Sequence, residues 1–88
     1  MKVEFRSSFA KDIKSVRDKA LLKRVRELIE EVERAKSPSE ISNLKKLKGH
    51  GDYYRIRIGD YRVGITLAGG ILVFARFLNR KDIYKYFP

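Results

Sequence analysis

Two apolar stripes with helical spacing run through residues 9–35. Their phases differ, which predicts a break near residues 18–20 and an antiparallel pair of helices. A serine at position 7 or 8 would cap the first helix, because its hydroxyl can accept hydrogen bonds from the first turn. Pro38 disfavours helical geometry in the preceding residue, so the second helix is expected to end there. The stripes comprise Phe9, Ile13, Val16 and Ala20, then Leu21, Leu22, Val25, Leu28, Ile29, Val32 and Ala35.

Apolar residues occupy every second position in the second half of the chain and at its start, which is the spacing of β-strands. Residues 53–58 and 61–67 alternate apolar and polar side chains, with the tight turn Gly59-Asp60 between them. Gly69-Gly70 makes a second turn, and residues 71–77 are apolar apart from Arg76, as expected for a strand covered on both faces. Residues 2–6 predict one further strand.

These elements predict an α+β fold with the order β-α-α-β-β-β. We expect a small antiparallel twisted sheet packed on an N-terminal helical hairpin. Ile41, Leu44 and Leu47 anchor a connecting segment, and residues 80–87 form a short C-terminal helix or tail. The 88 residues suit a single domain, residues 1–88.

Positive charge is concentrated in the second half. Residues 1–44 carry 11 basic and 8 acidic residues, a net charge of +3, whereas residues 45–88 carry 10 basic and 3 acidic residues, a net charge of +7. Such an excess indicates nucleic acid, an anionic membrane or an acidic protein as partner. A membrane surface would favour a basic amphipathic helix, but the excess lies on strands and loops, which favours nucleic acid.

The composition excludes several classes of site. The chain has no cysteine, so it has neither disulfides nor thiolate zinc ligands. Its N-terminus lacks the apolar region of a signal peptide, and no apolar run approaches a membrane span, so we expect a soluble cytoplasmic protein. His50, Asp52, Asp60 and the carboxylates of residues 27–33 are interpreted as solvated, so neither a metal nor another cofactor is expected.

Strand alternation gathers arginines on one face of the predicted sheet. Arg55 and Arg57 lie about 7 Å apart, the hairpin turn brings Arg62 alongside, and Arg80 follows the last strand. A single arginine there could serve solubility alone, but several like charges this close repel one another unless an anion joins them. Guanidinium groups suit phosphate because they donate two parallel hydrogen bonds. Lys45, Lys46 and Lys48 extend the basic region before the hairpin.

Tyrosines accompany these cations. If residues 80–87 are helical, Tyr84 lies one turn beyond Arg80 on the same side. A tyrosine can stack on an unpaired base or join acid–base chemistry through its hydroxyl. Tyr86 is open to either role, whereas Tyr54 and Phe87 are expected to pack in the core.

Residues 44–88 strongly resemble the RelE-like toxins of the RelE/ParE superfamily, through LKKLKG, YRIRIGDYRV and RKDIY. Residues 5–13 also look like the start of the family. The resemblance implies the toxin of a type II toxin–antitoxin pair, neutralised by a cognate antitoxin. It further implies a metal-independent endoribonuclease that cleaves mRNA in association with the ribosome.

Family roles transfer by position. The resemblance assigns Arg62, Arg80 and Tyr84 to catalysis, in which an RNA 2′-hydroxyl attacks the adjacent phosphate. The family's C-terminal tyrosine falls on Tyr84 or, as an alternative, on Tyr86. Many members have histidine where this chain has Asn79, so the proton acceptor is open between Tyr84 and another group. RNA binding is assigned to Lys45, Lys46, Lys48, Arg55, Arg57 and Tyr86.

Two alternatives remain at the level of sequence. A ParE-like toxin would use the same fold against DNA gyrase, although the arginines and the tail tyrosine favour RNA. A non-catalytic relative would bind RNA or the ribosome without cleaving it, which Asn79 would suit.

Overall fold

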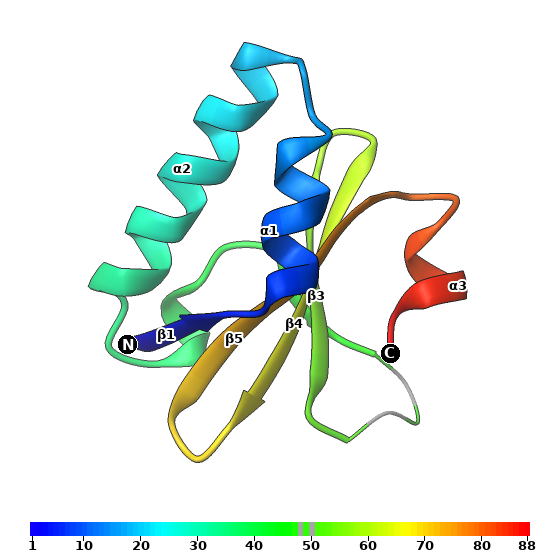
Figure 1. The fold of residues 1–88 in the computed structure, drawn as a ribbon. Coiled ribbons are helices and arrows are strands. Elements are labelled where there is room, and N and C mark those ends of the chain that lie inside the picture. Colours follow the sequence, from blue (N-terminus) through cyan, green and yellow to red (C-terminus); the bar gives the residue numbers. More distant parts are fainter. Residues whose placement is uncertain (48, 50) are drawn as a thin grey trace.

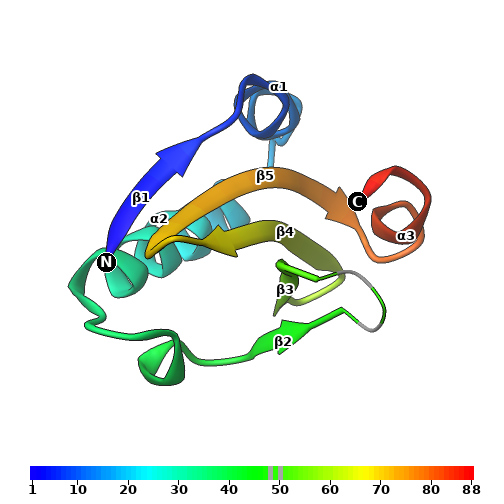
Figure 2. The same ribbon diagram turned by 90° about the horizontal axis from the view of Figure 1, so that it is seen from below.

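A five-stranded sheet forms the centre of the described chain, with strand order β1-β5-β4-β3-β2 (Figures 1 and 2). The computed structural model describes residues 1–47, 49 and 51–88. The predictions for Lys48 and His50 therefore lie outside the described residues. The strands are β1 (Lys2–Phe5), β2 (Leu44–Lys46), β3 (Tyr53–Ile58), β4 (Tyr61–Ala68) and β5 (Ile71–Asn79); the helices are α1 (Ser7–Lys14), α2 (Lys19–Arg34), α3 (Ile83–Tyr86) and a 3₁₀ turn (Pro38–Glu40).

The predicted α+β class and the three-stranded meander are confirmed. Ile58 pairs with Tyr61 and Ala68 pairs with Ile71, so each hairpin has a two-residue turn. Gly59 has φ +57°, and Gly69 and Gly70 have φ +60° and +77°. Glycine adopts these positive φ angles without steric cost, which is why both turns could be recognised from local sequence.

Two features of the sheet differ from the prediction. β1 pairs with β5 in parallel, with Val3 opposite Leu72, so the sheet is mixed and not antiparallel throughout. The segment expected only to connect helix and hairpin contains β2, which pairs antiparallel with β3. Three residues are too few to show a period of two, and a parallel pairing between chain segments this far apart leaves no local signal.

α2 packs on one face of the sheet, and α1 packs along β5 where β1 ends (Figure 2). The predicted break is confirmed: the Asp18 carboxylate caps α2 by accepting from the amides of Ala20 and Leu21 at 3.0 and 3.1 Å. The predicted serine cap of α1 is wrong. Arg6 occupies the N-cap position without a side-chain hydrogen bond, and the Ser8 hydroxyl instead donates to the Ala75 carbonyl at 2.7 Å.

α1 takes over from β1 as the neighbour of β5. β1 pairs with β5 only as far as Phe74, after which the Arg6 amide donates to the Phe74 carbonyl at 3.0 Å. Further along, the Asp12 carboxylate accepts from the Phe77 amide at 2.9 Å. Side chains of α1 thus satisfy backbone groups that an unpaired strand edge would leave open.

The core has two parts, one on each face of the sheet. The main cluster joins Phe9 and α2 to Ile56, Val63, Ile65, Leu72, Phe74 and Phe77. The smaller cluster lies on the other face beneath α3 and contains Leu47, Ala75, Ile83 and Phe87. β5 is therefore covered on both faces, as predicted. None of the described helices has the length and apolar character needed to span a membrane.

Candidate functional site

β3 and β4 carry arginines on the sheet face opposite α2. Arg55 and Arg57 alternate with the buried Ile56 and Ile58, and Arg57 pairs directly with Arg62 across the hairpin. The predicted grouping of these three side chains is therefore present in the fold. We refer to Arg55, Arg57, Arg62 and Arg80 as the arginine cluster.

The β3–β4 turn holds two members of the arginine cluster in place. Nη1 of Arg62 donates to the carbonyls of Gly59 and Tyr61 at 3.0 and 2.9 Å. The backbone amide of Arg80 donates to the Asp60 carbonyl at 2.8 Å. One short turn thus orients the Arg62 guanidinium and fixes the backbone from which the Arg80 side chain extends, before any ligand binds.

Burial and neighbouring positive charges together lower the pKa of Arg62. It is lowered first by partial burial, then by the positive charges of Arg55 and Arg57, with a smaller effect from Arg80. The phenol of Tyr84 acts in the opposite direction and raises the same pKa. All four residues therefore lie close enough to Arg62 to act on its charge, and an anion bound among them would relieve the repulsion.

Tyr84 and Tyr86 extend outward from α3. Their side chains are 62 % and 60 % exposed, whereas Ile83 and Phe87 of the same segment are buried. The tail is thus the short amphipathic helix that was one of the two predicted forms. It docks on the sheet face over β4 and β5.

The two described lysines of the predicted set lie on different faces. Lys45 pairs with Arg55 and shares its face, whereas Lys46 pairs with Tyr54, whose side chain packs against the main core. Both lysines are exposed. Adjacent residues of a strand point to opposite faces, so the structure separates Lys46 from the arginine cluster.

Sequence reasoning did not assign a role to Arg76. Its Nε lies 2.8 Å from Oδ2 of Asp12 and its Nη2 donates to Oδ1 at 3.2 Å. The hydrogen bond with Asp12 is the main cause of the raised pKa of Arg76. The guanidinium carbon also lies 6.0 Å from the centre of the Tyr86 ring. Arg76 is thus neutralised by α1 and contacts one tyrosine of α3.

Asn79, the residue in place of the family's histidine, supports the entry into α3. Its side-chain oxygen accepts from the Lys81 amide at 3.0 Å, and its carbonyl accepts from the Asp82 amide at 2.9 Å. The Asn79 side chain is therefore engaged in shaping the turn between β5 and α3.

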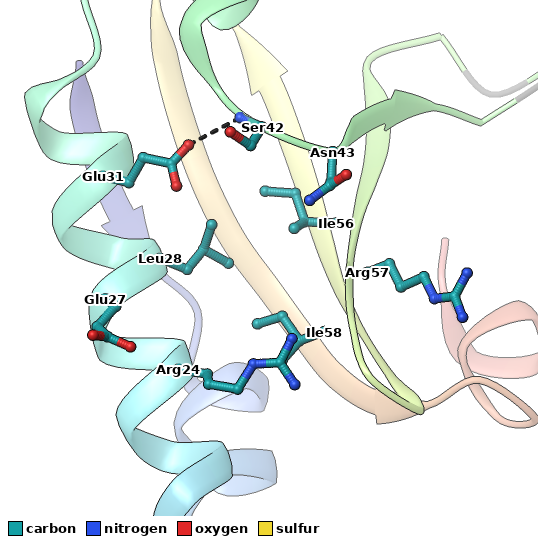
Figure 3. A pocket seen from close by; sticks show the side chains of 9 residues that line it. All are labelled: Arg24, Glu27, Leu28, Glu31, Ser42, Asn43, Ile56, Arg57 and Ile58. Atoms are coloured by element: carbon teal, nitrogen blue, oxygen red, sulfur yellow. Dashed lines mark hydrogen bonds between the residues drawn. The ribbon is translucent and has the colours of Figure 1, made fainter.

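A pocket of about 200 Å³ between α2 and β3 lies beside the arginine cluster but does not suit a phosphate (Figure 3). Glu27 and Glu31 line it, and Glu31 accepts from the Ser42 amide at 2.9 Å. Arg57 extends away from α2 in this view, toward the side where α3 lies. Among the described residues, no three potential His, Cys, Asp or Glu metal ligands gather at one place.

The fold and the arginine cluster define a small α+β protein with a cationic sheet face. The chain belongs to the ParE toxin family of type II toxin–antitoxin systems: the family model described as ParE toxin of type II toxin-antitoxin system, parDE, matches residues 3–84. Within that group it is a toxin of the RelE type. It is 45 % identical to Toxin RelE3 of Methanocaldococcus jannaschii over 89 residues, which cover 100 % of both chains.

Solved structures agree with this assignment. The chain resembles the RelB–RelE antitoxin–toxin complex from Methanococcus jannaschii with a TM-score of 0.82 and 42 % identity, over 97 % of this chain and 99 % of the other. It resembles the archaeal RelE–RelB complex from Pyrococcus horikoshii with a TM-score of 0.71 and 29 % identity, over 90 % and 93 % of the two chains. The predicted RelE-like family is therefore confirmed.

Proposed function

We propose that this toxin is a metal-independent endoribonuclease that cleaves mRNA. The observation that carries the proposal is the arginine cluster on one sheet face, where Arg57 pairs directly with Arg62 across the hairpin and the Arg80 backbone is held by the same turn. Tyr84 is close enough to act on the charge of Arg62. Such a cluster binds an anion because the anion relieves its repulsion. An exposed tyrosine beside the phosphate position adds a ring for base stacking and a hydroxyl for proton transfer.

In the proposed reaction, the RNA 2′-oxygen attacks the neighbouring phosphorus while the bond from phosphorus to the 5′-oxygen breaks. The products are a 2′,3′-cyclic phosphate and a free 5′-hydroxyl. Arg62 and Arg80 stabilise the negative charge that develops on the phosphate oxygens. Tyr84 relays the proton from the 2′-hydroxyl, and the 5′-oxygen takes up a proton as it leaves.

Arg55, Arg57 and Lys45 bind the flanking phosphates in this proposal, and Tyr86 stacks on a base. Arginine is a poor proton acceptor because it stays protonated at neutral pH. The site therefore depends on substrate positioning. We propose that the ribosome supplies this positioning by presenting mRNA in a defined geometry, which places the toxin's action in the cytoplasm.

We further propose that a cognate antitoxin neutralises the toxin. The RelE-type structures from Methanococcus jannaschii and Pyrococcus horikoshii are complexes with RelB. A protein with a net charge of +10 favours an acidic partner segment, because complementary charge accelerates association and suppresses wrong partners.

A second candidate function is inhibition of DNA gyrase, since the matching family model is that of the parDE toxin. A third is RNA or ribosome binding without cleavage, which the structural engagement of Asn79 supports. The arginine cluster with Tyr84 favours RNA cleavage over both, because it pairs phosphate-binding groups with a hydroxyl able to move a proton.

Brief induction of the toxin followed by primer extension on mRNA distinguishes these functions. We expect discrete cleavage sites with the wild type and none with Arg80→Ala at unchanged thermal stability. The matched control, Arg26→Ala, removes an exposed arginine from α2 and should cleave normally. Intact mRNA together with a DNA-damage response would contradict the proposal in favour of gyrase, and intact mRNA without that response would favour binding alone.

Purified toxin should then cleave the same mRNA without added metal, in the presence of ethylenediaminetetraacetate. Running this reaction with and without ribosomes tests the proposed ribosome association. Cleavage that needs a divalent cation would contradict the metal-independent mechanism.

A further inference from the structure

Gly64 is a buried glycine in the interior of β4, and its backbone does not require glycine. Its φ is not among the positive values found in the described chain. A glycine inside a strand costs about 0.5–1 kcal/mol relative to alanine. Such a glycine commonly marks a place where another group approaches the backbone closely.

Phe87 is the group that approaches Gly64. A Cβ atom added at Gly64 would lie 2.8 Å from Cγ and Cδ2 of Phe87 and 3.0 Å from Cδ1. These atoms are at the root of the ring, so they cannot move aside as a flexible side-chain end could. Phe87 is only 4 % exposed and also meets Tyr53 edge-on at 5.4 Å. The ring thus fits against β4 only because position 64 lacks a side chain.

The Gly64–Phe87 contact is one of the two side-chain contacts that hold α3 on the sheet. α3 has only four residues. The buried side chains of Ile83, at its start, and Phe87, just beyond its end, anchor it to the sheet. The Phe87 amide donates to the Ile83 carbonyl at 2.8 Å, which closes the single helical turn between the two anchors. A single turn has almost no stability of its own, so its position depends on these side-chain contacts.

Gly64 also lies in the middle of the cationic face. It pairs with Arg55 on β3 and with Arg76 on β5, and Arg62 is two residues earlier on the same strand face. Phe87 therefore docks α3 on the strand face that carries Arg55 and Arg62, and Tyr84 on the exposed side of α3 is close enough to act on the charge of Arg62.

We infer that Gly64 and Phe87 are positioning residues that place the Tyr84 hydroxyl beside Arg62. Neither residue contacts RNA in this inference, and both act through α3. The inference rests on the proposed function and adds the reason why β4 contains a glycine. It implies that loss of the Gly64–Phe87 contact slows the chemical step while the arginine cluster continues to bind substrate.

Steady-state kinetics of RNA cleavage by the Gly64→Ala and Phe87→Ala variants test this inference. We expect each variant to lower kcat by about 10- to 100-fold, because small misplacement of a reacting group is costly, with little change in KM. The double variant should be about as slow as either single variant, because both disrupt the same contact. Thr66→Ala, on the same face of β4, is the matched control and should retain the wild-type kcat.

Fluorine NMR of toxin labelled with 3-fluorotyrosine measures the position of Tyr84 directly, with Tyr84→Phe to assign its signal. The Tyr84 signal should shift in both variants and stay in place in Thr66→Ala. An unchanged Tyr84 signal with unchanged kcat in folded Phe87→Ala would overturn the inference. So would a change confined to KM, or strictly additive losses in the double variant. If Gly64→Ala does not fold, Phe87→Ala decides, because it introduces no clash into the sheet.

The labelled protein also separates this inference from the proposed function. Wild-type toxin that leaves RNA intact contradicts the proposed function. The Tyr84 signal then decides the positioning role alone: a shift in Phe87→Ala supports it, and an unchanged signal overturns it.

Discussion

At the scale of single residues, the site holds the positive charge of Arg62 in surroundings that disfavour it. Arg62 is held by two carbonyls of its own hairpin, yet its pKa is lowered by burial and by its neighbours. A lowered pKa means that the protonated side chain is less favourable in the folded chain than in the unfolded one. This cost is present at every pH below the folded-state pKa, and therefore at neutral pH. The free toxin gives up stability that a bound phosphate would restore.

Replacing Arg57 with Gln should therefore stabilise the free toxin and weaken RNA binding. We expect the melting temperature at low salt to rise by a few degrees, and the rise to fade in high salt because exposed charges are screened. Differential scanning fluorimetry across a salt series measures it. Arg26→Gln on α2 is the matched control and should change the melting temperature less. A lower melting temperature for Arg57→Gln at low salt would contradict the role assigned to repulsion.

At the scale of elements, α1 substitutes for a sheet neighbour. Asp12 accepts from the Phe77 amide and also binds the Arg76 guanidinium, so one carboxylate closes the edge of β5 and neutralises a cation. Arg76 in turn lies against Tyr86 of α3. A helix at the start of the chain thus supports the strand that precedes the C-terminal helix.

Asp12→Ala should lower the free energy of unfolding by about 2–3 kcal/mol, because it leaves a backbone amide and a half-buried guanidinium without their partner. Asp12→Asn should lose only about 1 kcal/mol, because the amide oxygen can still accept from the Phe77 amide. Urea denaturation of the three proteins measures both differences. Equal losses in the two variants would mean that the charge alone matters.

The two adjacent lysines of β2 test the assignment of faces. Lys45 shares the face of Arg55, and Lys46 points to the other side. We expect Lys45→Gln to weaken RNA binding several-fold and Lys46→Gln to have a smaller effect, although both substitutions remove one exposed positive charge. Fluorescence anisotropy with a labelled oligoribonucleotide measures both. Equal effects would show that net charge, and not the face, determines binding.

At the scale of the whole molecule, charge is separated by layer. The helical layer mixes acidic and basic residues, whereas the opposite face of the sheet carries the arginine cluster. This separation directs a long-range field outward from one face and would steer an RNA strand toward it.

RNA affinity should consequently fall steeply with salt. If the arginine cluster and Lys45 together neutralise four or five phosphates, the logarithm of the binding constant should fall with the logarithm of salt concentration at a slope of about −3. Anisotropy titrations from low to physiological salt give this slope. A slope near zero would contradict phosphate binding as the main source of affinity.

Residue spacing alone determined the parts of this fold that depend on near neighbours. The two-residue turns at Gly59 and at Gly69-Gly70, the alternation along β3, and the break before α2 were all predicted, because each depends on residues a few positions apart. The same locality let the sequence predict that Arg55, Arg57 and Arg62 share a face, and the motifs of residues 44–88 identified the family.

Only the tertiary structure decided what joins segments distant in sequence. The parallel pairing of β1 with β5, the Asp12–Arg76 ion pair and the seating of Phe87 on Gly64 all depend on such contacts. The glycine within the strand pattern at position 64 indicated a close approach to the backbone, but the sequence did not show that the approaching group is the Phe87 ring. That partner comes from 23 positions away along the chain, and packing of the completed sheet is what brings it there.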